Sequence, residues 1–206
     1  MMKLLRNDVQ AGDIFYIPAI TPAGEVGFVL ARFIEHVEHN AGALIEVFKK
    51  FYREPPKTLG QVDMTERLFR PILCSMRFSE IPRWRILFRD EAYDRLVSNY
   101  RDITLEYHSD FRVGGVRHPK PVSEHGYASC SPYEAATCWR MHHIVFRVNA
   151  HLAGYFGPND SCRMSEIPED MRIGNEVAEQ KVLGLAKEVD GLFKKWAKNS
   201  SSFVGC

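Results

Sequence analysis

Residues 12–52 read GDIFYIPAITPAGEVGFVLARFIEHVEHNAGALIEVFKKFY, and this stretch decides the fold. Three apolar runs in it, at 12–20, 26–37 and 44–52, are rich in Val, Ile, Phe and Tyr, residue types that favour strands. The connections TPAGE and EHNAGA contain the Gly, Pro and Asn residues typical of tight turns. We therefore predict three antiparallel strands in a meander, with Pro18 at a strand end or on an edge because proline cannot donate to a ladder.

The pattern after the meander predicts more strands and one short helix. Residues 70–78 and 83–89 alternate between apolar and polar positions, as strands with one core face do. Asp90 is a suitable cap for a short helix over 91–100, and residues 103–111 could add another strand. The following segment, VGGVRHPKPVS, has the Gly and Pro content of a loop.

The C-terminal third of the chain has helical periodicity. Ser131 followed by Pro132 is typical of a helix start, and we expect that helix to run to about residue 155. A second helix is expected over 174–198, and its apolar stripe can pack on the first helix or on a second copy of the chain. We expect packing within one chain, and hence a monomer rather than a homodimer. The stripe consists of Val182, Leu185, Val189, Leu192 and Trp196.

These elements predict an α+β fold, in which a bent antiparallel sheet with a short helix is followed by a C-terminal helical hairpin. We expect an antiparallel β-rich domain over 1–115, a loop over 116–130 and a helical region over 131–206.

Composition and charge narrow the classes of protein. The chain has 206 residues with 27 basic and 26 acidic side chains, and its net charge of +1 gives no general attraction to nucleic acid or anionic membranes. Arg32 interrupts the longest apolar run, which is too short to span a bilayer. The start of the chain lacks the pattern of a signal peptide, and five cysteines without a CxxC pair fit reduced thiols. We expect a cytoplasmic protein.

Histidines and cysteines do not form a recognisable catalytic or metal motif. His142 and His143 are adjacent, so on a helix their side chains point about 100° apart and do not share a face. Cys138 and His142 are four residues apart, with Glu134 four residues earlier, which could form a nucleophile set on one helix face. A packed cysteine is the simpler interpretation, and we expect no catalytic residues, no metal and no cofactor.

Arginines are concentrated between residues 67 and 101, where they are the only basic residues, eight against four acidic ones. Arg77, Arg83, Arg85 and Arg89 could form a stripe on the polar face of two strands, able to contact phosphates or an acidic protein. A solvated strand face with carboxylate partners explains the same pattern.

A second charged cluster lies at the turn after the second strand. Glu35, His36, Glu38 and His39 are at or near a hairpin tip, which we expect to be exposed. Loops on a rigid sheet often carry recognition, so these four residues, together with Arg83 and Arg85, are the candidate partner-binding residues.

One short motif resembles a known family. GDIFYIP (12–18), followed after a turn by GFVLAR (27–32), resembles the start of the immunity protein 26 family, small antitoxin-like proteins encoded beside bacterial polymorphic toxins. The similarity is clearest over 10–37, extends loosely to residue 115 and does not include the helical region. The resemblance implies a small curved sheet and a non-catalytic protein that binds a cognate toxin domain and blocks its active site.

We therefore expect an immunity protein whose partner is a toxin domain, and a nucleic-acid-binding module that uses the arginine stripe is the alternative. A small enzyme built around Cys138 and His142 is a third interpretation.

Overall fold

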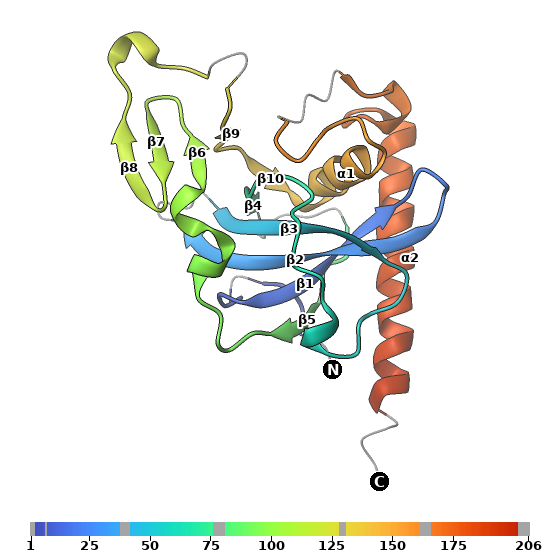
Figure 1. Cartoon of the computed structure of the whole chain (residues 1–206). Coiled ribbons are helices and arrows are strands. Elements are labelled where there is room, and N and C mark those ends of the chain that lie inside the picture. Colours follow the sequence, from blue (N-terminus) through green and yellow to red (C-terminus); the bar gives the residue numbers. More distant parts are fainter. Residues whose placement is uncertain are drawn as a thin grey trace.

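The computed structural model has an α+β fold, which confirms the predicted class (Figure 1). Its described residues form a six-stranded sheet, a four-stranded sheet and two α-helices. No helix in this part of the chain is long and apolar enough to cross a membrane. The structure describes residues 3–6, 8–37, 42–75, 81–127, 131–160 and 166–201, with side chains up to 197.

The predicted meander is confirmed. Strands β1 (Asp13–Ile20), β2 (Val26–Val37) and β3 (Gly42–Tyr52) pair antiparallel in chain order. Pro18 lies within β1, but strand β5 (Ile86–Arg89) pairs only with the first residues of β1, so β1 is an edge at Pro18. Further along, the backbone N–H of Ile20 donates to Asn149 Oδ1 of the C-terminal region, at 3.0 Å.

Three short strands complete the larger sheet, in the order β10-β4-β3-β2-β1-β5. Strand β4 (Ile72–Ser75) is antiparallel to β3 and β5 (Ile86–Arg89) is antiparallel to β1, whereas β10 (Cys138–Arg140) is parallel to β4. The alternation expected over 83–89 holds at its start, where Trp84 is fully buried and stacks on Phe15.

The predicted helix over 91–100 is wrong. Two 3-10 helices, η2 (Arg95–Ser98) and η3 (Tyr100–Asp102), take its place, and Asp94 rather than Asp90 accepts the capping N–H. Asn99 separates them in the left-handed conformation, with φ of 46°. Asp, Ser and Asn side chains compete for backbone hydrogen bonds and favour turns over a continued α-helix.

The second sheet was predicted in part. The expected strand over 103–111 is two strands, β6 (Thr104–Glu106) and β7 (Asp110–Val113), and the expected loop contains β8 (Val116–Pro119). Gly114 and Gly115, with φ of 52° and 86°, form the two-residue turn between β7 and β8. The boundary expected at residue 115 therefore falls inside a hairpin. The strand order is β8-β7-β6-β9, with β9 at Glu134–Ala135.

The first C-terminal helix begins later than predicted. Helix α1 spans Met141–Leu152, because residues 134–140 are in β9, β10 and their connection. A buried ion pair links β9 to α1, in which Arg147 Nη1 and Nη2 donate to the two oxygens of Glu134 at 2.6 and 2.9 Å. Helix α2 (Glu176–Ser201) confirms the second predicted helix, and both helices contact β1.

The buried stripe of α2 differs from the prediction at its C-terminal end. Val182, Leu185 and Val189 are buried as expected, but Leu192 is 42% exposed, and Phe193 takes the expected core position. Phe193 stacks on Tyr16 of β1 with ring centroids 3.9 Å apart. A helix turns about 100° per residue, so a heptad stripe drifts around it, and the contact with the sheet passes to Phe193.

One core cluster includes residues of the larger sheet, α1 and α2, so the sheet and helices are packed as one unit. A second, smaller cluster joins β2, β3 and β4 to the η3 region and β6. The four-stranded sheet thus packs on one side of the larger sheet, and Figure 1 shows it projecting at the upper left, away from α2. The described residues also include the 3-10 helices η1 (Leu59–Gln61), η4 (Val122–Glu124) and η6 (Glu169–Met171).

Candidate functional site

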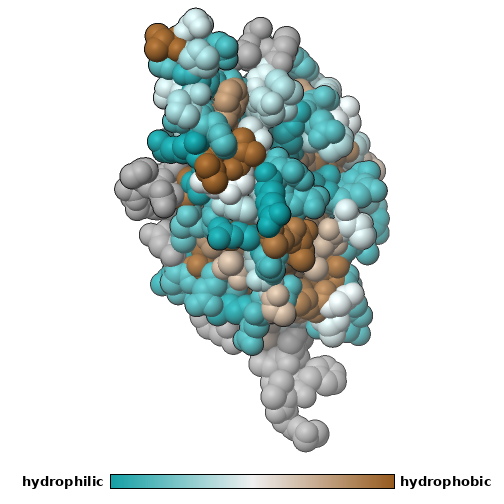
Figure 2. All heavy atoms as spheres, turned by 60° about the vertical axis from the view of Figure 1, so that its left-hand side comes forward, coloured by the Kyte–Doolittle hydropathy of each residue, from teal (hydrophilic) through white to brown (hydrophobic). Residues whose placement is uncertain are grey.

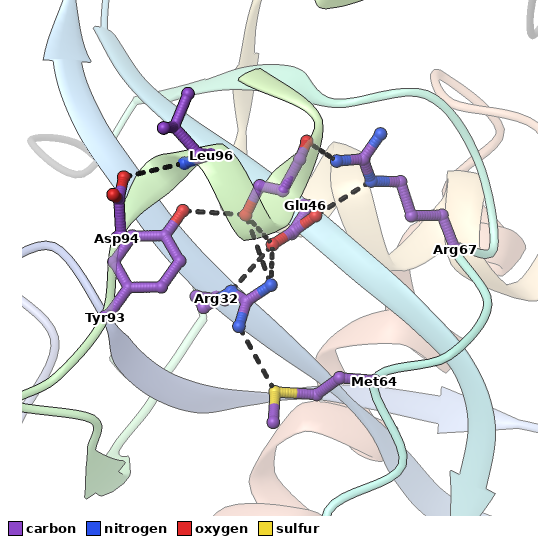
Figure 3. Close-up of polar contacts among 8 residues, drawn as sticks. Arg32, Glu46, Met64, Arg67, Tyr93, Asp94 and Leu96 are labelled. Carbon is purple, nitrogen blue, oxygen red and sulfur yellow. Dashed lines mark hydrogen bonds and ion pairs between the residues drawn. The ribbon is translucent and has the colours of Figure 1, made fainter. Parts of the chain in front are cut away.

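A buried charge network lies where η2 packs on the larger sheet (Figure 3). Arg32 of β2 and Glu46 of β3 face each other in the ladder, and their side chains are 5% and 2% exposed. Glu46 Oε1 accepts from Arg32 Nε at 2.7 Å and from Ser98 Oγ at 2.6 Å, and its Oε2 accepts from Arg67 Nε at 2.8 Å. One carboxylate therefore positions two guanidinium groups.

Aromatic and polar neighbours enclose the Arg32 guanidinium. It lies 4.6 Å from the ring centroid of Tyr93 and 5.4 Å from that of Phe48. The Tyr93 hydroxyl and Ser98 Oγ are 2.7 Å apart. Burial raises the pKa of Tyr93, against the lowering effect of its hydrogen bond with Ser98, and the charge of Glu46 raises it further. The phenol is therefore neutral, and the network holds two cations and one anion.

A cleft of about 360 Å³ opens beside this network, between the two sheets and the loop after α1. Arg67 reaches from the network to the cleft wall with its side chain 27% exposed. Arg70, also in the wall, donates to the backbone carbonyl of Asn159, and no carboxylate in the described part of the chain pairs with it. The other polar lining residues are Asn99, Asp102, Thr104 and Tyr133.

Glu35 attaches the four-stranded sheet to the larger one. Its Oε1 accepts from the Tyr100 hydroxyl at 2.7 Å and from Arg112 Nη2 of β7 at 2.9 Å, and its Oε2 accepts from Arg95 Nη1 at 2.9 Å. Burial raises the pKa of Tyr100, and the hydrogen bond to Glu35 adds to the shift, so the hydroxyl remains a donor. We refer to Glu35 and these three donors as the Glu35 latch.

We expect Glu35→Ala to loosen the four-stranded sheet without unfolding the whole chain. Loss of the carboxylate leaves two arginines and a tyrosine without their shared acceptor, which costs about 1 to 3 kcal/mol. Amide hydrogen exchange in β7 and β8 should become about 10- to 100-fold faster, with β1 and β2 unaffected. The matched control is Glu25→Ala, which removes an exposed ion pair with Arg53. Unchanged protection in β7 and β8 would show that the latch does not hold this sheet.

Exposed apolar side chains are concentrated in one stretch of the chain, from η2 to the residue before β9. Nine large hydrophobic side chains are exposed in the described residues, and six of them lie between residues 96 and 133. The view in Figure 2 brings the side of this sheet forward and shows apolar groups separated by hydrophilic surface. Tyr133 is one of these six residues and also lines the cleft. We call the set the apolar rim; it consists of Leu96, Val97, Val116, Val122, Tyr127 and Tyr133.

The candidate residues at the hairpin tip are placed differently from the expectation. The side chain of Glu35 is 15% exposed and belongs to the latch, so it is not an open charge at a tip. His36 is exposed and packs its ring on Phe33. Glu38 and His39 lie outside the described residues.

Two of the four arginines in the predicted stripe, Arg85 and Arg89, form internal ion pairs. Arg85 donates through Nε and Nη2 to Asp190 of α2 at 3.0 and 2.9 Å, and Arg89 binds both oxygens of the buried Asp13. Arg83 contacts the backbone carbonyl of Leu5 at 3.4 Å. Arg77 lies outside the described residues. For Arg85 and Arg89, the structure agrees with the interpretation in which the arginines pair with carboxylates of the same chain.

The structure contradicts the helical geometry considered for Cys138 and His142 as a nucleophile set. Cys138 is in strand β10, whereas His142 is in the first turn of α1, so the two do not share a helix face. Desolvation raises the pKa of Cys138, which disfavours the thiolate. Glu134 is paired with Arg147 and is therefore not available to orient His142.

Comparison of the chain with protein families, curated proteins and solved structures finds no match.

Proposed function

We propose that this chain is a binding protein that recognises a bacterial toxin domain, the immunity role that the N-terminal resemblance implies. The observation that carries the proposal is the apolar rim, six exposed apolar side chains between η2 and β9, together with the polar cleft whose lining shares Tyr133 with the rim. Surfaces that bind proteins commonly combine exposed apolar side chains with polar surroundings.

The chemistry of this surface suits a protein partner. Aromatic residues and arginine are enriched at protein interfaces and often supply much of the binding energy. The rim offers two tyrosines, Tyr127 and Tyr133, and the cleft offers Arg67 and Arg70. The buried network fixes the position of Arg67, so less conformational entropy is lost on binding. A toxin loop that presents a carboxylate flanked by apolar groups would match this arrangement.

In this proposal the chain inhibits its partner by covering it and performs no chemical step. The four-stranded sheet would lie over the toxin's active site or the entry to it, with the rim as the packed contact. Charged groups at the edge would set the association rate and the choice of partner.

Titration against a toxin domain encoded by a neighbouring gene, the partner that the proposal requires, tests the function. We expect a complex of one chain with one toxin domain and loss of toxin activity when the two are equimolar. Calorimetry and the toxin's own activity assay give independent readouts. No complex with that domain would contradict the proposal, as would tight binding of RNA or DNA at physiological salt that is lost in Arg83→Ala with Arg85→Ala.

A further inference from the structure

Two histidines and a glutamate from distant parts of the chain meet between the two α-helices. His142 and His143 lie in the first turn of α1, and Glu179 lies near the start of α2. One potential ligand atom from each lies within 4.8 Å of the others. The spacing of the histidines in the sequence does not predict this cluster, because its third residue comes from α2.

We propose that this His142–His143–Glu179 cluster binds a divalent transition-metal ion, Zn²⁺ by preference. Two imidazoles and one carboxylate form a ligand set that zinc uses in proteins when a fourth position is left to water. The expectation of no metal site rested on adjacent histidines pointing apart on a helix. In the structure, however, their ring centroids are 4.0 Å apart.

The distances require a small adjustment. Bonds of about 2.0 to 2.1 Å to a tetrahedral ion place ligand atoms about 3.4 Å apart, so the side chains need to close by at most about 1.4 Å. His143 and Glu179 are half-buried, which leaves them room to move, whereas His142 is buried. Glu179 Oε1 accepts the backbone N–H of Gly174 at 3.1 Å, which orients the carboxylate.

The electrostatic setting limits the affinity. The cluster lies at the N-terminal turns of both helices, where the helix dipoles oppose a cation. One carboxylate offsets part of this effect. We therefore expect a micromolar dissociation constant, and a bound ion would connect α1 to α2 and stabilise their packing.

Zinc titration of the purified chain, with any affinity tag removed, tests the site. We expect one Zn²⁺ per chain and, at a free concentration 100 times the dissociation constant, a melting temperature raised by about 5 to 10 °C. His143→Gln and Glu179→Gln should each weaken binding by at least about tenfold, because each removes one of three ligands. His118→Gln with His125→Gln, both exposed and in another part of the fold, is the matched control and should bind as the wild type does.

Cobalt gives a readout that does not depend on the stability of a variant. Co²⁺ bound by the wild-type chain should give the visible absorption of a low-coordinate site, and Zn²⁺ should displace it. Absence of both zinc binding and the cobalt spectrum would overturn the proposal. Zinc binding that survives both ligand substitutions but is lost in the control would overturn it as well.

Discussion

Replacing Glu46 by alanine is expected to lower the free energy of unfolding by about 3 to 5 kcal/mol, because it leaves a buried cation without its partner. Arg32 is 5% exposed and pairs with Glu46, and Ser98 and Arg67 lose the same acceptor. Chemical denaturation followed by circular dichroism measures the loss.

The matched control is Glu66→Ala. Glu66 pairs with Lys49 on the surface, with both side chains more than half exposed, and pairs of this kind contribute about 1 kcal/mol or less. The double variant Arg32→Met with Glu46→Leu removes both charges and should recover most of the loss. A Glu46→Ala chain as stable as the Glu66→Ala chain would contradict the proposed role of the network.

Phe193→Ala is expected to cost about 3 to 5 kcal/mol of unfolding free energy, because it leaves a cavity between α2 and the sheet. Its side chain is 1% exposed and lies against both Tyr16 and Phe28. Denaturant titration measures the change, at two protein concentrations so that any dimer contribution is visible.

Trp196→Ala is the comparison for Phe193→Ala. The helical stripe in the sequence includes Trp196 and omits Phe193. It therefore predicts a larger loss of unfolding free energy for Trp196→Ala than for Phe193→Ala. Trp196 is half-buried, so we expect a cost below about 2 kcal/mol. A loss at Trp196 equal to that at Phe193, or one that depends on protein concentration, would support the stripe read from the sequence and contradict the packing described for α2.

The sequence predicts elements well where the pattern is local. The meander was predicted because each strand carries its own apolar run and its turns have typical residues. The β7–β8 hairpin was missed, although Gly114-Gly115 between valines is a known hairpin signal. Strand β10 could not be predicted in this way, since its partner β4 is more than sixty residues away in the sequence.

The candidate site was harder to predict because the partners of charged residues are remote. Arg85 looked like an exposed strand residue, but its partner Asp190 is 105 residues away. The sequence places Glu35 near a hairpin tip, whereas its three donors come from η2, η3 and β7. One signal was present in the sequence: Arg32 and Glu46 are charged residues at apolar strand centres, a position that calls for a buried partner.

The measurement that tests the central claim most directly is the affinity of two valine variants for the proposed partner, a toxin domain encoded by a neighbouring gene. Val97 in the apolar rim and Val177 at the start of α2 are 65% and 59% exposed, so replacing either by aspartate should leave the fold intact. Calorimetry should show Val97→Asp binding at least about tenfold more weakly, because a charge would be buried in the contact, and Val177→Asp binding as the wild type does. Equal affinities for the two variants would contradict the account of the apolar rim as the recognition surface.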